Sequence, residues 1–348
     1  MIDKAFLNVV MFVEVALLVL SLAVFFSHGL WLFVNQRRVV RLRARARESL
    51  SRLVNRGTIN LDDIELLKQL PKNVQVMAFL EISNNVSGTG KERLRFVARE
   101  VELLDRARVL CESRRWTRRL RGARLFSRLD VSNPLVEKLL ADPHPVVRAQ
   151  AAEWAATHPS PAVVNRMLEM LADPATQARF AVQDALLRMG TFVAEPLVSF
   201  LETHDGRAAA SALQVAEALA STSFRPGALR LSQSDDMNVR LAAANLLGGI
   251  GDEPSAARLT VMLKDSESRV RAAAARGLGR MQHWQAASQL AEGLRDSTWR
   301  VRRESGLALR AIGAPGALFL RRALKSDDAF AADMAQLVMD LPAAAAGG

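Results

Sequence analysis

The sequence lacks tyrosine, has one cysteine, and contains only 5% aromatic residues among its 348 positions. The lone cysteine, Cys111, excludes an internal disulfide, and nothing beside it suggests a metal or redox pair, so a reducing compartment is expected. The scarcity of aromatic residues, against an abundance of Ala, Leu, Val and Arg, favours helices over β-rich folds. We therefore predict an all-α protein that is long enough to bury its own core.

Lysine is also scarce. Only seven of the 47 basic residues are Lys and the other 40 are Arg, and the net charge is +11. Codon bias in a GC-rich genome can produce such a preference for Arg. The places where charge clusters are therefore more informative about function than the total charge.

One long apolar run covers residues 5–34. Its polar interruptions include Asn8, Glu14, Ser21 and His28. A helix of this length rises about 45 Å, which exceeds the roughly 30 Å of hydrocarbon in a bilayer. A cleaved signal peptide fits poorly, because residues 1–4 are nearly neutral and no small-residue cleavage site follows. We predict a short extracytoplasmic N-terminus and a single-pass transmembrane helix within residues 1–35.

Six arginines follow the apolar run within residues 37–47, against Lys4 and the terminal amine on its other side. By the positive-inside rule the N-terminus lies outside and residues 36–348 lie in the cytoplasm. Trp31 and Phe33 fit the inner aromatic belt. The predicted location is the inner (cytoplasmic) membrane of a bacterium.

Three polar residues of the apolar run, Glu14, Ser21 and His28, are seven positions apart. Seven residues turn a helix by 700°, so each lies about 20° from the last and the three form one polar stripe. The stripe could pack against a partner helix, in a homo-oligomer or a larger membrane complex. Alternatively, Glu14 reaches outward and His28 lies among the inner headgroups at little cost. Both interpretations remain open.

From residue 140 onward one pattern returns about every 31 residues. Its arginines are Arg148, Arg179, Arg240, Arg271 and Arg302, and its aspartates, six or in one case five positions earlier, are Asp142, Asp173, Asp235, Asp265 and Asp296. A degenerate copy centred on Ala210 fills the one double interval. Small or apolar residues at helical spacing follow each arginine. Each repeat is predicted to consist of a first helix, a turn at the aspartate, a second helix and a loop. The aspartate is well placed to cap the second helix.

The pattern resembles the HEAT repeat, in particular the short HEAT-like form first associated with phycobilisome lyases. The match lies in the Asp, the Val-Arg about six positions later, and the second helix of small residues, over residues 140–341. The resemblance implies an α-solenoid, ladders of Asp and Arg that tie neighbouring repeats together, and a concave surface that receives protein partners. The glycine pairs at 248–249 and 277/279 would let adjacent second helices pack closely.

The domain organisation follows from these segments. Residues 36–112 should form basic juxtamembrane and linking helices, among them helices at 60–70, 74–82 and 92–111. The solenoid should extend over residues 113–341, with a degenerate first repeat, and residues 342–348 should be a disordered tail.

Two further features could contact partners. Arg114, Arg118, Arg121 and Arg128 share one helix face opposite Trp116, Leu120 and Ala123. That face could meet anionic lipid or an acidic partner, or it could simply be solvated; nucleic acid is not expected because no recognition signature accompanies it. Trp299 stands at a repeat turn where other copies have small or polar residues, and it either forms an exposed contact or folds back on the neighbouring helix, which is slightly favoured.

Catalytic signals are sparse. None of the five histidines, His28, His144, His158, His204 and His283, belongs to a His-Glu or an i, i+4 pair. HEAT-like metal hydroxylases bind iron through His-Glu dipeptides, so the sequence offers no ligands for that class of enzyme. We expect no cofactor and no metal. The favoured function is a non-catalytic membrane scaffold, for instance an accessory subunit of a cell-envelope complex for polysaccharide synthesis or export. The alternative is a HEAT-like lyase or hydrolase.

The arginine cluster generates a topology prediction. A reporter enzyme that is active only outside the membrane should give no signal when it is fused after residue 348, because residues 37–47 hold the chain's C-terminal part in the cytoplasm. A reporter that is active only in the cytoplasm serves as the control. High activity of the external reporter would refute the predicted topology.

Overall fold

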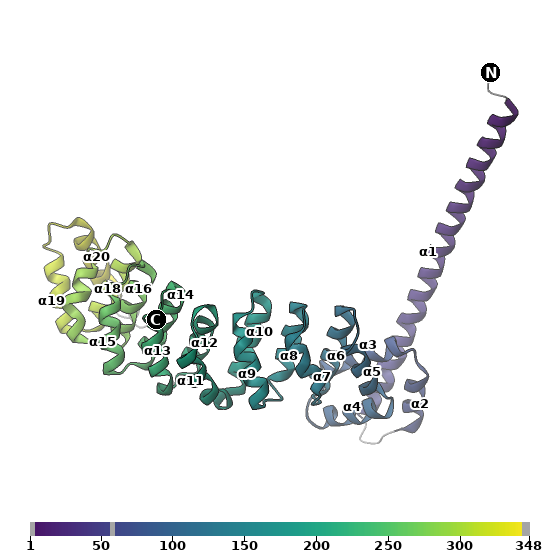
Figure 1. Ribbon diagram of the computed structural model, residues 1–348, viewed down its shortest axis with the longest axis horizontal. Coiled ribbons are helices and arrows are strands. Elements are labelled where there is room, and N and C mark those ends of the chain that lie inside the picture. Colours follow the sequence, from purple (N-terminus) through teal and green to yellow (C-terminus); the bar gives the residue numbers. More distant parts are fainter. Residues whose placement is uncertain (1–3, 56–59, 343–348) are drawn as a thin grey trace. The chain divides into compact units, whose positions relative to one another are not determined.

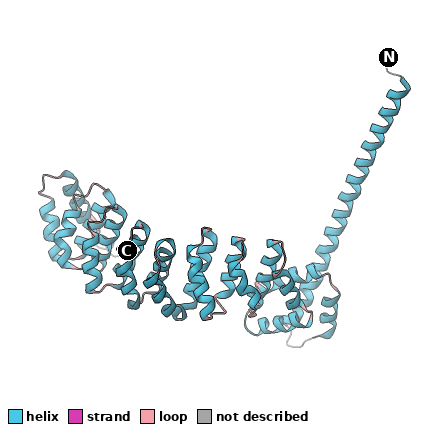
Figure 2. Cartoon of the chain, viewed as in Figure 1, coloured by secondary structure: helices cyan, strands magenta, loops and turns pink. Residues whose placement is uncertain are grey.

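A computed structural model describes residues 4–55 and 60–342. Every regular element in these two ranges is a helix (Figure 2), so the all-α prediction is confirmed. Part of the expected extracytoplasmic N-terminus, residues 1–3, and nearly all of the expected disordered tail lie outside the described residues. By its contacts the chain divides into two compact units, residues 1–135 and 136–348.

The first unit begins with α1 (Lys4–Asn55), a helix of 52 residues (Figure 1). At 1.5 Å per residue it is about 78 Å long, and it crosses residue 35 without a break. It is the one described helix that is long and apolar enough to cross a membrane. Its C-terminal part is buried through Ala46, Leu50 and Leu53, because there it packs against α2 (Leu61–Gln69), α3 (Lys72–Ser83) and α4 (Gly88–Glu100).

The helix expected over residues 92–111 is two helices. The chain breaks at Glu102, whose left-handed backbone (φ 55°) separates α4 from α5 (Leu103–Cys111). The last helix of the unit is α6 (Trp116–Leu129), which packs on α5 and α3. For this reason the boundary between the two compact units falls after α6. Burial raises the pKa of the Cys111 thiol to about 12, which leaves it unreactive.

The second unit consists of helix pairs. Its first helices are α7 (Pro134–Lys138), which contains the unit boundary, α9 (Pro161–Glu169), α11 (Ala194–Thr203), α13 (Arg225–Leu231), α15 (Glu253–Met262), α17 (Ala287–Gly293) and α19 (Ala314–Ala323). Its second helices are α8 (Pro145–Ala155), α10 (Thr176–Met189), α12 (Gly206–Leu219), α14 (Met237–Ile250), α16 (Ser268–Arg280), α18 (Trp299–Ala311) and α20 (Ala329–Asp340). Short 3-10 turns cover Leu139–Ala141, Met170–Ala172, Gly190–Val193, Thr222–Phe224 and Trp284–Ala286.

These pairs form two layers, which Figure 1 shows. From α8 to α20 each second helix packs against the next second helix, and from α9 to α19 the first helices form the other row. Four of the five repeat arginines are followed seven positions later by a leucine, and these four leucines, Leu186, Leu247, Leu278 and Leu309, are fully buried. Burial of each such side chain contributes about 1.5–3 kcal/mol to the free energy of folding.

Two second helices approach backbone to backbone. A Cβ added to Gly248 would lie 2.7 Å from the Cα of Gly277, so neither α14 nor α16 tolerates a side chain at this crossing. Gly249, the next residue, has nothing within 4 Å of its added Cβ. The two glycines of this pair therefore have different roles, and only the first permits the close contact.

A pair of substitutions tests this packing. Gly248→Ala should lower the stability of the second unit by about 1–3 kcal/mol, because the new methyl group forces two packed helices apart. Gly249→Ala, the matched control, should leave stability unchanged or raise it by up to about 1 kcal/mol through better helix propensity. Thermal unfolding followed by circular dichroism measures both, and equal effects would contradict the assigned crossing.

Candidate functional site

Three arginines of the repeat each join two adjacent helix pairs. The pairs, 25 residues apart in sequence, are Arg148–Asp173, Arg240–Asp265 and Arg271–Asp296. In each pair Nε donates to one carboxylate oxygen over 2.6–2.8 Å, and Nη2 donates to the other over 2.8–3.0 Å. We call these three pairs the arginine ladder. Bidentate contact of this kind fixes both distance and angle between repeats.

The remaining guanidinium nitrogen binds the arginine's own repeat. Arg271 Nη1 donates to the backbone oxygens of Asp265 (2.9 Å) and Ser266 (3.0 Å) in the turn before α16. Asp296 in turn accepts the amide hydrogen of Thr298, which is the N-cap residue of α18. The aspartate therefore closes the turn before the second helix. The sequence had suggested that it caps this helix, and that prediction is wrong. The carboxylate lies too far before the first helical amides to reach them.

The ladder carboxylates are held ionised. Burial alone would raise the pKa of Asp173, Asp265 and Asp296. Hydrogen bonds from the partner arginine and from the turn amide more than offset this effect, so each pKa lies below its usual range.

Other copies deviate from the expected ladder. Ser234, not Asp235, accepts the turn amide before α14, and Arg240 Nη1 donates to the Ser234 backbone oxygen, so serine occupies the aspartate position there. Asp235 is exposed and lies one residue too late in the turn. Ser326 occupies the same position before α20. Its neighbouring arginine, Arg302, instead lies over the Phe330 ring at 4.8 Å.

Two further predicted members, Arg179 and Asp142, contact the backbone of turns in their own repeats. Arg179 Nη1 donates to the Asp173 backbone oxygen (2.8 Å), and the next turn offers it no aspartate at the ladder position. Asp142 is buried and accepts the amide of His144, and its backbone oxygen accepts Arg148 Nη1.

One repeat arginine escaped the sequence reasoning. Arg119 Nη1 donates to the backbone oxygens of Ser113 and Arg114, both at 3.0 Å, which is the same five- and six-residue pattern that the ladder arginines show. Ser113 accepts the turn amide of Arg115 as Ser234 does elsewhere. A degenerate first repeat was expected here, but its arginine was not identified, because Arg119 precedes Arg148 by 29 residues and the turn has serine in place of aspartate.

The predicted membrane stripe lies on α1 with all three side chains exposed. Ser21 Oγ donates to the Leu18 backbone oxygen of its own helix (3.0 Å), and His28 stacks on Trp31 with 6.1 Å between ring centroids. Glu14 projects from the same helix. The structure therefore leaves the stripe available for a partner helix and does not itself provide one.

On α6 the side chains of Arg118, Arg121 and Arg128 are exposed, and Leu120 and Ala123 are buried as expected. Arg114 is exposed as well, but it lies in the turn before α6 and is not part of the predicted helix face. Trp116 is not on the buried side, because it is 40% exposed at the first position of α6. Trp299, at the first position of α18, is 55% exposed. The expectation that it folds back on its neighbour is wrong, since the start of the helix directs it outward beside Arg303.

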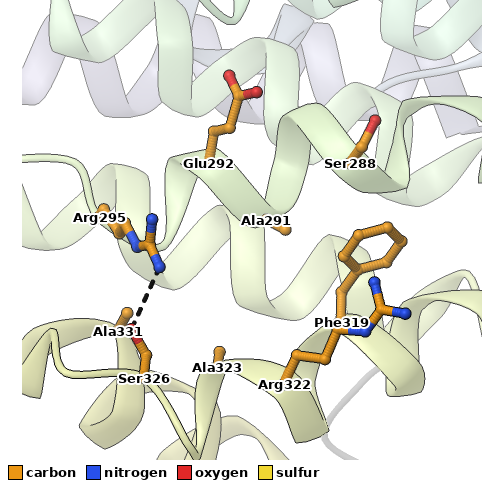
Figure 3. Close-up of a pocket in the computed structure, with 9 residues that line it drawn as sticks. All are labelled: Ser288, Ala291, Glu292, Arg295, Phe319, Arg322, Ala323, Ser326 and Ala331. Atoms are coloured by element: carbon orange, nitrogen blue, oxygen red, sulfur yellow. Dashed lines mark hydrogen bonds between the residues drawn. The ribbon is translucent and has the colours of Figure 1, made fainter.

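A cavity of about 230 Å³ lies between α17 and α19 (Figure 3). Arg295 Nη2 donates across it to Ser326 Oγ (3.2 Å), and Arg322 lies over the Phe319 ring at 5.6 Å. Glu292 is the one acidic group in its lining. Among the described residues, no three His, Cys, Asp or Glu side chains gather as metal ligands would.

Comparison of the sequence with known protein families also identifies the repeats. Residues 132–220 and 255–338 match the family model of HEAT repeats. No curated protein shows significant sequence similarity to the chain.

Solved structures with a similar fold include an engineered protein (18% identity, 88% of this chain and 95% of that one, TM-score 0.40). Yeast importin-beta, Kap95p, matches at 12% identity over 84% of this chain, with a TM-score of 0.47, and this chain spans 51% of its length. YibA of E. coli matches at 14% identity over 82% of this chain and 97% of its own, with a TM-score of 0.41.

The ladder generates a stability prediction. Asp296→Asn keeps the shape of the side chain but removes the charge that Arg271 binds, and it should cost about 1.5–3 kcal/mol of stability at pH 7. Asp184→Asn is the control, because it breaks the exposed pair with Arg188 and should cost at most about 1 kcal/mol. Equal losses in urea unfolding of the two variants would contradict a structural ladder.

The same variant tests the charge. Because the pKa of Asp296 is lowered on folding, its ionised form stabilises the protein fully above the unfolded pKa of about 3.9, and this stability is lost as the pH falls through the folded pKa. The stability difference between wild type and Asp296→Asn should therefore be constant from pH 5 to 8 and shrink below about pH 4. A difference that does not change down to pH 3 would rule out the ionised pair as its source.

Proposed function

We propose that this protein is a membrane-anchored, non-enzymatic scaffold that binds partner proteins through its HEAT repeats. The observation that carries the proposal is the exposure of large apolar side chains on the second-helix layer, with Phe180 61%, Trp299 55% and Phe330 66% exposed. Aromatic residues and arginine are the residue types that dominate binding energy at protein interfaces. The repeated Asp and Arg residues serve mainly to join repeats, which leaves the outer faces of the helices free to vary with the partner.

The membrane anchor is the N-terminal part of α1. Its described large apolar side chains between Met11 and Val34 are exposed, as lipid-facing side chains would be. The arginines of residues 37–47 follow on the same helix, so the proposed orientation has the N-terminus outside and the repeats in the cytoplasm. From Val34 to the first buried residue of the helix, Ala46, the rise is about 18 Å. The first unit would thus lie next to the inner membrane surface.

That placement favours a partner in or at the membrane. The stripe of Glu14, Ser21 and His28 would then contact a transmembrane helix of the partner, because lipid disfavours polar groups. An accessory subunit of a cell-envelope complex, for instance for polysaccharide synthesis or export, fits this arrangement.

Affinity purification of the full-length protein in mild detergent, followed by mass spectrometry, tests the scaffold function. We expect a membrane complex to co-purify in stoichiometric amount. Replacement of Glu14, Ser21 and His28 together by Leu should preserve membrane insertion and reduce recovery of the partner, because interhelical hydrogen bonds contribute about 0.6–2 kcal/mol each.

The control for the stripe is an exchange of residues 5–34 for a poly-Leu helix of equal length. Unchanged recovery with this anchor would assign binding wholly to the repeats and remove the role of the stripe. If no protein co-purifies with the wild type, even after chemical cross-linking in intact cells, the scaffold function itself is refuted.

A further inference from the structure

Positive charge in the second-helix layer is concentrated on two neighbouring helices. α16 and α18 carry eight arginines and one glutamate, whereas no other second helix of the unit has more than two arginines. The next helix, α20, has no arginine and exposes Asp333 and Asp340. The positive surface is therefore two helices wide, and an acidic border follows it.

A buried carboxylate organises the centre of this surface. Glu304 on α18 is only 7% exposed, and it accepts hydrogen bonds from Arg276 Nε of α16 (3.2 Å) and from Arg303 Nη1 (3.0 Å). It thereby holds two guanidinium groups from adjacent repeats side by side. Both side chains remain partly exposed, 34% for Arg276 and 45% for Arg303, so further N–H groups face the solvent.

An apolar anchor adjoins these arginines. The Trp299 ring, one helical turn before Arg303, is 55% exposed, and the Arg303 guanidinium carbon lies 5.9 Å from its centroid. Arg269 and Arg300 are exposed one repeat apart on the same two helices. A large aromatic ring among guanidinium groups is the composition of an interface hot spot.

We propose that the exposed face of α16 and α18, around Arg276, Arg303 and Trp299, binds an acidic segment of a partner protein that carries an apolar side chain for Trp299. This inference rests on the scaffold function proposed above and names the chemistry of one partner segment. Carboxylates fit guanidinium groups in bidentate geometry. Glu304 already binds both guanidinium groups from within, through one hydrogen bond to each. The border at Asp333 and Asp340 would repel a polyanion that continues along the layer, which favours a short peptide over nucleic acid or a lipid surface.

Fluorescence anisotropy of a fluorescein-labelled peptide of ten glutamates with one central phenylalanine tests the proposal on the full-length protein in detergent. The double variant Arg276→Ala, Arg303→Ala should weaken binding at least about tenfold. The double variant Arg166→Ala, Arg321→Ala removes the same charge from the first-helix layer and should change binding less than about twofold. Equal losses in the two double variants would overturn the proposal.

Trp299→Ala should weaken binding of this peptide by about three- to tenfold and leave binding of plain decaglutamate nearly unchanged. An equal effect on both peptides would remove Trp299 from the site. The two exposed arginines provide a variant that spares the packing, since Arg269→Glu together with Arg300→Glu should abolish binding with an unaltered circular dichroism spectrum. Retained binding in this variant would contradict the assigned surface.

Competition separates the other anions. The competitors are unlabelled peptide, a single-stranded decanucleotide and soluble dihexanoyl phosphatidylglycerol. If the nucleotide or the lipid displaces the labelled peptide at a concentration tenfold lower than the unlabelled peptide does, the assignment to an acidic protein segment is overturned. The scaffold function is separable from this inference. If the natural partner co-purifies equally with wild type and with the Arg276→Ala, Arg303→Ala variant, the scaffold stands and the α16–α18 site is wrong.

Discussion

The second unit depends on one constraint: a helix pair of this length cannot bury its apolar face alone, so each repeat must be held against the next at a fixed distance. The arginine ladder satisfies this constraint at three joints, because one guanidinium binds the next repeat's carboxylate and its own turn at once. The buried leucines between the layers supply most of the favourable free energy. Burial of apolar side chains does not depend on direction, so the arginine ladder fixes the distance and angle between adjacent repeats.

Where the ladder is absent, other contacts join the repeats. Around α12 the Arg position holds Ala210, and the link to neighbouring repeats runs through Gln183 to Gln214 and through Ser234 to Asp205. Gln183 Nε2 donates to Gln214 Oε1 (2.9 Å) and to the Ser211 backbone oxygen (3.5 Å), and Ser234 Oγ donates to Asp205 Oδ1 (2.7 Å). In a chain of stacked repeats, stability is approximately the sum of such local interfaces. The joints on either side of α12 show no bidentate Arg–Asp pair among the described residues, and neither does the joint between α18 and α20, where Arg302 lies over the Phe330 ring.

The outer face of the second-helix layer differs from the joints in kind. Its residues vary from helix to helix, with Phe180 on α10, arginines and Trp299 on α16 and α18, and acidic residues on α20. A repeated frame with a variable outer face is the arrangement by which repeat proteins recognise different partners. α1 also has two parts with different surroundings. Its N-terminal apolar segment is exposed, and its C-terminal part is buried against the other helices of the first unit.

Sequence alone determined the period of 31 residues, the helix pairs, the resemblance to HEAT repeats and the one long apolar run, because periodicity and hydropathy are local properties of the chain. Tertiary structure decided which residues meet. It placed Ser234 in place of Asp235, revealed Arg119 as a repeat arginine, distinguished Gly248 from Gly249, and brought Arg276 to Glu304 across 28 positions. Each of these outcomes depends on how one helix rotates and approaches the next, and that geometry is set by contacts between repeats, which no single repeat encodes.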